Sequence, residues 1–236
     1  MQVLSGIYWV SGGEGALNQS SISLQEVMSV KGKMVFCVVC DGNPQCGAGE
    51  IAGGYAAEKL TAWFHQKAVV LAGKGKGRKQ INRSMQCEWH SIYHDMKYFA
   101  KKNQTILSCS VTALLLLKNR YQIWHLGNTP VYVYRKRQTV LTQASAAARQ
   151  KQGSYLDSRQ WTAPAAGYGH IYKNSGMLIC TNEFCRHITA EKLTEAMLPE
   201  EIRTEQSIRK RLKQIADTAA KAQQTGDRAA VYLKIL

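Results

Sequence analysis

Two pairs of side chains in this sequence have the spacing of metal ligands: Cys37 with Cys40, and His90 with His94. A CxxC pair can supply two thiolates to zinc, and histidines four residues apart share one face of a helix. Neither set is completed, because the chain has no second CxxC motif and no Glu between the two histidines as in HExxH. The residue pattern therefore favours a core strand at the cysteines and an ordinary helix face at the histidines.

The elements that would carry these pairs follow from hydrophobic patterning. Residues 34–40 are almost entirely apolar and predict a buried strand, on which Cys37 and Cys40 point to opposite faces. Residues 84–100 predict a helix with one apolar stripe. The stripe consists of Trp89, Ile92, Tyr93, Met96 and Phe99. We interpret this stripe as core rather than as a ligand site.

The remaining elements give the fold class. Further strands are predicted at residues 6–10, 22–27, 105–117, 121–126, 131–134, 140–142, 177–180 and 229–236. Further helices are predicted at residues 48–70, 189–197 and 205–222. Residues 144–170 predict no definite structure. Because helices follow groups of strands instead of alternating with them, the order indicates an α+β layered domain with antiparallel sheets.

Length and composition exclude several classes of protein. With 236 residues, of which 45% are hydrophobic, the chain can bury a core and is neither disordered nor collagen-like. Its longest apolar run, residues 111–117, is far shorter than the ~20 residues of a membrane-spanning helix, and the first ten residues lack a signal-peptide pattern. Seven cysteines, an odd number, fit reduced thiols. We therefore expect a cytoplasmic protein with a single domain over residues 1–236.

Positive charge is concentrated in three segments, 74–79, 135–137 and 209–211. The chain has 31 Lys and Arg against 16 Asp and Glu, which gives a net charge of +15. Such a surface attracts nucleic acid, anionic lipid or acidic protein segments. No nucleic-acid-binding motif accompanies the charge, so nucleic acid is not expected to be the main partner.

Four segments, in sequence order, resemble the motifs of the metal-dependent type 2C (PPM-type) Ser/Thr protein phosphatases. They are CDGNPQCGAGEIA at 40–52, LGNTPVYVYR at 126–135, LICTNEF at 178–184 and GDRAAV at 226–231. Their order, over nearly the whole chain, is more specific than any single match. The resemblance implies that family's fold, an α+β four-layer sandwich of two antiparallel β-sheets flanked by helix pairs.

The resemblance also implies a metal site. In that family two Mg or Mn ions lie between the sheets and hold the water that attacks the phosphoryl group. Carried over to this sequence, Asp41 is the bridging aspartate, the carbonyl of Gly42 is a ligand and Asp227 is the last metal aspartate. Ser20 and Asn182 stand where the family has further aspartates.

The missing carboxylates determine the functional hypothesis. Unit charges ~4 Å apart interact by roughly 4 kcal/mol at an effective dielectric constant of ~20, so losing two carboxylates should weaken a two-ion site by orders of magnitude. Gly15 also replaces the Arg that would clamp phosphate. We expect a pseudophosphatase that binds Mn or Mg weakly or at a single site. It would act by binding a phosphoprotein or acidic protein partner, such as a Ser/Thr kinase or its substrate.

Two alternatives stay open. The carboxylate of Glu183 could replace the one missing at Asn182, and Glu14 lies beside Gly15. The chain would then be an active Mn- or Mg-dependent Ser/Thr phosphatase with an altered metal site. The third hypothesis is that the basic surface binds nucleic acid or anionic lipid.

Overall fold

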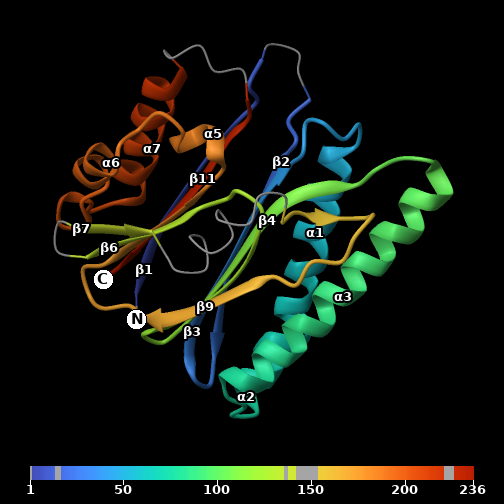
Figure 1. The fold of residues 1–236 in the computed structure, drawn as a ribbon. Coiled ribbons are helices and arrows are strands. Elements are labelled where there is room, and N and C mark those ends of the chain that lie inside the picture. The colour runs from blue at the N-terminus through green and yellow to red at the C-terminus, as the bar shows by residue number, and fades with distance from the viewer. Residues whose placement is uncertain (1, 14–16, 136–137, 142–153, 221–225) are drawn as a thin grey trace.

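The computed structural model describes residues 2–13, 17–135, 138–141, 154–220 and 226–236. Its strands form two antiparallel sheets, which we call sheet I and sheet II. Helices cover the outer face of each sheet, so the layers follow one another as helix, sheet, sheet and helix (Figure 1). This arrangement confirms the predicted α+β four-layer sandwich.

Sheet I has the strand order β1–β11–β10–β6–β7. Its strands are β1 (Val3–Val10), β6 (Val131–Arg135), β7 (Gln138–Leu141), β10 (Gly176–Cys180) and β11 (Arg228–Ile235). Sheet II has the order β2–β3–β4–β5–β9, with β8 paired to β4. Its strands are β2 (Ser20–Ser29), β3 (Gly32–Gly42), β4 (Ser108–Leu117), β5 (Arg120–Leu126), β8 (Leu156–Asp157) and β9 (Ala165–His170).

Each sheet has its own group of helices. Those on sheet II are α1 (Gly49–Trp63), a π-helical turn (Phe64–Ala68), α2 (Val69–Gly73) and α3 (Arg78–Asn103). Those on sheet I are α5 (Asn182–Cys185), α6 (Ala190–Ala196), a 3-10 turn (Pro199–Glu201) and α7 (Glu205–Ala220). No helix among the described residues is long and apolar enough to cross a membrane.

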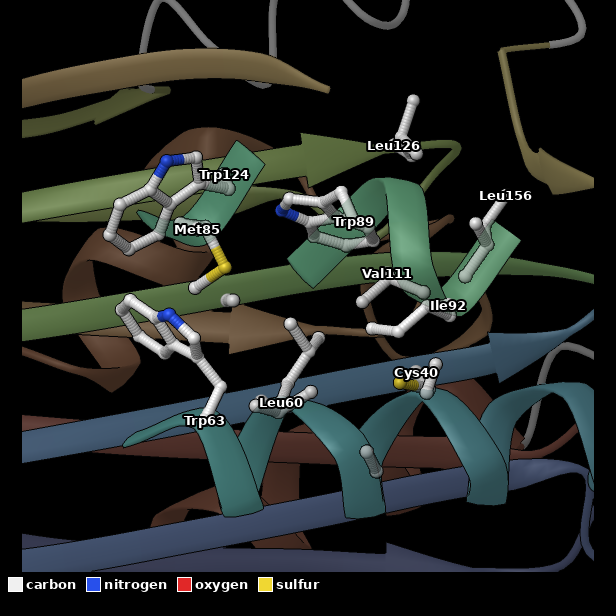
Figure 2. Close-up of a cluster of buried hydrophobic side chains, with 14 of the residues drawn as sticks. Cys40, Leu60, Trp63, Met85, Trp89, Ile92, Val111, Trp124, Leu126 and Leu156 are labelled. Carbon is white, nitrogen blue, oxygen red and sulfur yellow. The ribbon is translucent and has the colours of Figure 1, made fainter. Parts of the chain in front are cut away.

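Aromatic and sulfur-containing side chains fill the layer between sheet II and its helices. Trp63 of α1, Trp89 of α3 and Trp124 of β5 point toward one another there (Figure 2). The rings of Trp63 and Trp124 meet edge to face with their centroids 5.8 Å apart. Cys40 belongs to this cluster, whereas Cys37 lies in the core between the two sheets. The two thiols therefore face opposite sides of β3, as the strand period predicts.

The structure differs from the sequence-based prediction at three places. Helix α3 begins at Arg78, six residues before the predicted start, and Phe99 of its supposed core stripe is 40% exposed. The segments 105–117, 121–126, 131–134 and 140–142 predict four consecutive antiparallel strands, but they are divided between the sheets, with β4 and β5 paired in sheet II and β6 and β7 in sheet I. The chain crosses over after Gly127, whose φ is 85°. Strands β8 and β9 lie within residues 144–170, for which no structure was predicted.

The predicted helix face at the histidines is confirmed. His90 and His94 are both exposed on α3, and the ring of His90 stacks on Trp161 with centroids 3.9 Å apart. The predicted residues 142, 144–153 and 221–222 lie outside the part of the chain that the structure describes.

Candidate functional site

Asp41 lies near the C-terminal end of β3, on the face of sheet II that packs against sheet I. Val39, two residues earlier on the same face, is part of the core between the sheets. The strand register places Ser20 of β2 directly opposite Asp41 on one side and Ser110 of β4 on the other. The three positions form a row across three strands. In this row, one carboxylate stands between two serines.

Ser20 closes the turn that leads into β2. Its hydroxyl donates a hydrogen bond of 2.6 Å to Oδ1 of Asn18, and its backbone N–H donates to the same atom over 2.9 Å. The residue is only 2% exposed. Ser20 therefore lies beside Asp41, and its hydroxyl supports local structure there.

Asp227 approaches the site from sheet I, immediately before β11. Its carboxylate accepts the backbone N–H of Gly12 at Oδ1 (2.9 Å) and that of Gln19 at Oδ2 (2.6 Å). Hydrogen bonds to a charged acceptor are stronger than neutral ones. Asp227 thus anchors the segment between β1 and β2 to the start of β11, a role that its sequence position did not reveal.

The end of β10 is joined to the same place. The hydroxyl of Thr181 donates to the carbonyl of Asp227 over 3.2 Å and accepts the N–H of Ala229 over 3.1 Å. Asn182 and Glu183 follow directly and form the start of α5. A Cβ at Gly226 would collide with Cγ of Glu183, so Glu183 packs tightly on the residue before Asp227.

The carboxylates of this region influence one another. Burial, and then the charges of Asp227 and Glu183, raise the pKa of Asp41 from 3.8 to about 7. Glu183 also forms an ion pair with Arg186 over 3.2 Å. Arg228, although it follows Asp227 in the chain, does not pair with these carboxylates. Its guanidinium donates instead to the carbonyl of Ala216 in α7. The carboxylate of Asp41 makes no hydrogen bond or ion pair with any described residue.

The loop after Asp41 is held by close backbone packing. Gly42 donates its N–H to the carbonyl of Gln19 over 3.0 Å. A Cβ at Gly42 would collide with the backbone of Gly49 at the start of α1. The first turn of α1 can therefore approach the end of β3 closely only because residue 42 is glycine, and a side chain at Gly49 would also be tight, with its Cβ 3.0 Å from the backbone N of Asn43.

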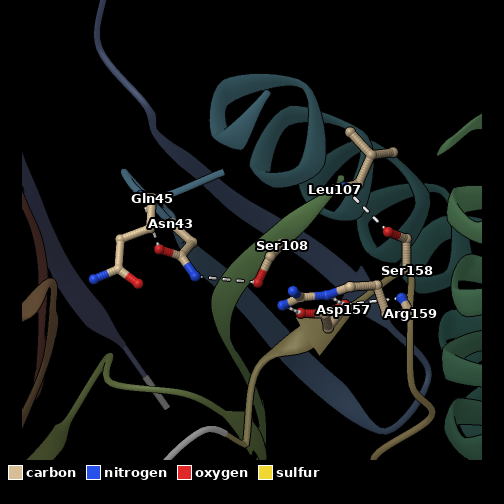
Figure 3. A network of polar contacts seen from close by, with 7 residues as sticks. All are labelled: Asn43, Gln45, Leu107, Ser108, Asp157, Ser158 and Arg159. Carbon is tan, nitrogen blue, oxygen red and sulfur yellow. Dashed lines mark hydrogen bonds and ion pairs between the residues drawn. The ribbon is translucent and has the colours of Figure 1, made fainter. Parts of the chain in front are cut away.

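Polar side chains fix the other side of this loop (Figure 3). The amide of Asn43 donates to the hydroxyl of Ser108 over 3.5 Å, and its Oδ1 accepts the N–H of Gln45 over 3.1 Å. Arg159 binds Asp157 through its Nε (3.0 Å) and Nη2 (2.6 Å). Partial burial alone would raise the pKa of Asp157, but hydrogen bonds from Arg159 and Ser108 outweigh burial and hold the pKa below its usual range.

The overall architecture matches solved protein phosphatases. The Ser/Thr phosphatase of S. agalactiae superposes with a TM-score of 0.76 at 10% identity, over 100% of both chains. Stp1 from Staphylococcus aureus gives 0.79 at 12% identity, over 100% of this chain and 96% of that one. The catalytic domain of PstP, solved with 2 manganese ions, gives 0.72 at 13% identity, over 98% and 97% of the two chains. This chain has the PPM phosphatase fold.

The similarity to these phosphatases is a similarity of fold, because the sequence comparisons find no related protein. No protein-family model matches the chain, and no curated protein sequence matches it. Within this PPM fold, the structure brings Ser20, Asp41 and Gly42 together at the end of sheet II, with Asp227 and Glu183 close enough to affect Asp41. Gly15 and Glu14 lie outside the described residues.

The donor set of this PPM-fold chain does not fit two divalent cations. Hard cations of this type require several carboxylate or carbonyl oxygens each. Here Asp227 is engaged by two backbone N–H groups and Glu183 by Arg186, which leaves Asp41 as the one carboxylate of the three without such a partner among the described residues. The described residues also include no group of three His, Cys, Asp or Glu side chains placed to hold a metal ion.

Ser110 is the site residue that sequence reasoning missed. Its hydroxyl accepts the backbone N–H of Asn128 over 3.0 Å, and a Cβ at Gly127 would collide with it. Ser110 thus ties the loop between β5 and β6 to the strand beside Asp41. Only the register of β3 with β4 reveals this, because a serine within an apolar run carries no signal of its own.

Proposed function

We propose that this PPM-fold chain is a pseudophosphatase, which binds a phosphorylated or acidic protein partner without hydrolysing phosphate through a pair of metal ions. The observation that carries the proposal is the row Ser20, Asp41 and Ser110, which offers a single carboxylate. A two-metal phosphatase needs enough anionic oxygens to neutralise four positive charges. The resemblance to the PPM motifs implies that two of these oxygens would come from positions 182 and 20, which in this chain are Asn182 and Ser20, both without charge.

A gain-of-function experiment tests this proposal. Wild-type protein should show no Mn-dependent hydrolysis of p-nitrophenyl phosphate and little Mn binding by calorimetry. The double variant Ser20→Asp with Asn182→Asp should bind Mn at least about tenfold more tightly, because each added carboxylate contributes several kcal/mol before screening. The same double variant combined with Asp41→Ala is the control and should lose the gain. Unchanged Mn affinity in the double variant would contradict the proposed cause of inactivity.

The second candidate function is an active phosphatase with an altered, single-metal site. It is favoured by the raised pKa of Asp41, which reflects burial first and then the negative charges of Asp227 and Glu183. One divalent cation there would relieve their repulsion. Wild-type turnover with Mn, abolished by Asp41→Ala and reduced by Glu183→Gln, would establish this candidate in place of the first.

The partner is proposed to be a Ser/Thr kinase or a kinase substrate that meets this chain in the cytoplasm. The net charge of +15 supports a partner with acidic or phosphorylated segments. Co-purification of the tagged full chain from its host before and after phosphatase treatment of the extract tests this. A bound protein that is retained equally after the treatment, and that has no acidic segment, would argue against the proposed partner class.

A further inference from the structure

A large groove lies at the end of sheet II that is remote from Asp41. It has a volume of about 930 Å³ and is bordered by the turns before β3 and between β4 and β5, by the end of β9 and by the start of α3. Strand β3 begins at this groove with Gly32 and reaches Asp41 only near its other end, nine residues later. At ~3.3 Å per residue the two places are about 30 Å apart. The groove is therefore a feature separate from the phosphatase-like site.

The rim of the groove is cationic. Six basic side chains line it, and the lining contains no Asp or Glu. They are Lys31, Lys76, Arg78, Lys79, Lys118 and Arg120. None of them forms an ion pair with a described residue. Such a concentration of unpaired positive charge is costly for the free protein and is relieved by an anionic ligand.

Positively charged side chains are also found next to the groove. A smaller recess beside it shares Lys31 and Lys118 and adds Lys173 and Lys33, of which Lys33 pairs with Glu26. By contrast, the basic segment on α7 is partly neutralised, because Arg211 pairs with Glu201 over 2.9 Å. Of the segment at 135–137, the last two residues lie outside the described residues. The groove is thus where the structure gathers positive charges that are scattered along the sequence.

The floor of the groove is aliphatic. Ile81 of α3 and Leu115 and Leu117 of β4 line it at the margin of the core between sheet II and its helices. A ligand that fills the groove must therefore combine an apolar group, for the floor, with several negative charges, for the rim. An extended protein segment with a leucine or phenylalanine between acidic residues has this chemistry.

The aromatic lining suits nucleic acid less well. Single-stranded nucleic acids bind basic grooves by stacking bases on free aromatic faces. Tyr168 on β9 is 65% exposed, but the guanidinium of Arg78 lies 3.5 Å from its ring centroid and covers one face. Tyr121, the other aromatic residue of the lining, packs toward the core between the sheets. The aliphatic floor and the covered ring of Tyr168 both favour a peptide ligand over a nucleic-acid base.

We propose that this groove is a docking site for an acidic protein segment that carries an apolar anchor residue. The inference deepens the partner-binding role proposed above and rests on it, since it assigns the surface by which the partner is held. The basic segment at 74–79, expected from sequence to be a generic charged surface, supplies three of the six rim cations. Docking about 30 Å from Asp41 leaves the phosphatase-like site free for a second part of the same partner.

Fluorescence anisotropy with three probes on the full chain tests the proposal. The probes are the labelled peptide EDELFEDE, the peptide EDESSEDE with the apolar pair replaced, and an oligothymidylate of similar length. We expect EDELFEDE to bind most tightly, and the serine peptide to bind at least about fivefold more weakly because it cannot use the floor. Equal binding of the two peptides, or tighter binding of the oligothymidylate, would overturn the proposal.

A matched pair of charge-reversal variants locates the binding. Arg78→Glu with Lys118→Glu changes the rim and should weaken EDELFEDE by at least about tenfold. Arg209→Glu with Lys210→Glu makes the same change in net charge on exposed positions of α7 and should alter the affinity less than about twofold. If both pairs weaken binding equally, only net charge matters and no groove-specific site exists. Hydrolysis of p-nitrophenyl phosphate by the same samples reports on the proposed function separately, because neither pair touches the Asp41 site.

Discussion

Replacing Asp41 with Asn removes an ionisable group from a partly buried position while keeping the size and shape of the side chain. In the folded protein, burial and then the charges of Asp227 and Glu183 raise the pKa of Asp41 from 3.8 to about 7. In the unfolded chain the same carboxyl is hydrated, so its pKa returns to the ordinary value. The folded state therefore holds the proton more tightly than the unfolded state does.

The sign of the pH dependence follows from this difference. Below about pH 4 Asp41 is protonated in both states, and its contribution to stability is fully present. Between about pH 4 and pH 7 only the folded state keeps the proton, so the free energy of unfolding of the wild-type protein falls as pH rises. A pKa difference of about three corresponds to about 4 kcal/mol. Asp41→Asn has no such loss and should gain up to about that much over wild type between the two pH values.

Urea unfolding followed by tryptophan fluorescence, in EDTA and at about pH 4, 6 and 8, measures this gain. Asp217→Asn, at an exposed position of α7, is the control and should follow the wild type at every pH. The same pH profile for Asp41→Asn and wild type would refute the reasoning, because it would show that Asp41 is hydrated in the folded protein. Repeating the series with Mn tells whether a cation takes over the role of the proton.

Four further substitutions test the fold around the site and the core. Asp227→Ala removes the acceptor of two backbone N–H groups and should cost about 2–3 kcal/mol, with faster hydrogen exchange at those amides; a loss below about 0.5 kcal/mol would contradict its anchoring role. Trp124→Phe removes a hydrogen bond of 2.7 Å from the indole N–H to Asn82, whereas Trp89→Phe removes an indole N–H without a partner in the described structure. In urea unfolding, Trp124→Phe should therefore lower the free energy of unfolding by about 1 kcal/mol more than Trp89→Phe does. Equal losses would count against the hydrogen bond to Asn82. Gly127→Ala, at φ 85°, should cost about 1–3 kcal/mol in thermal unfolding, and an unchanged midpoint would mean that the loop can relax.

Elements with a strong hydrophobic period were predictable from the chain alone. Leu60 and Trp63 of the helix predicted at residues 48–70 are buried, and Thr189, the first residue of the helix predicted at 189–197, caps α6 by accepting the N–H of Lys192. The start of α3 was missed because its first six residues include a single buried apolar side chain, Ile81. Strand β9 was missed because Ala-Ala-Gly-Tyr-Gly-His has no strand propensity of its own and is held by its pairing with β5.

The candidate site likewise has one part that local sequence predicts and one part that depends on the tertiary structure. The Asp-Gly loop at Asp41 and its position before α1 were readable as a local motif. The hydrogen bonds of Asp227, by contrast, join residues more than 200 positions apart in the chain, and the row of Ser20, Asp41 and Ser110 depends on strand register. No local pattern encodes such partners, because each strand could pair in several registers until the whole sheet forms.

The sequence by itself determined the fold class, the alternation of buried faces and the shortage of carboxylates at the expected metal positions, because these depend on residue type and on spacing along one element. Only the tertiary structure decided that Asp227 serves as an anchor, that the pKa of Asp41 is raised, and that distant lysines and arginines gather around one groove. Electrostatic energies depend on the distances between groups and on their burial. Both are set when separate strands and helices come together, not by the order of residues within any one of them.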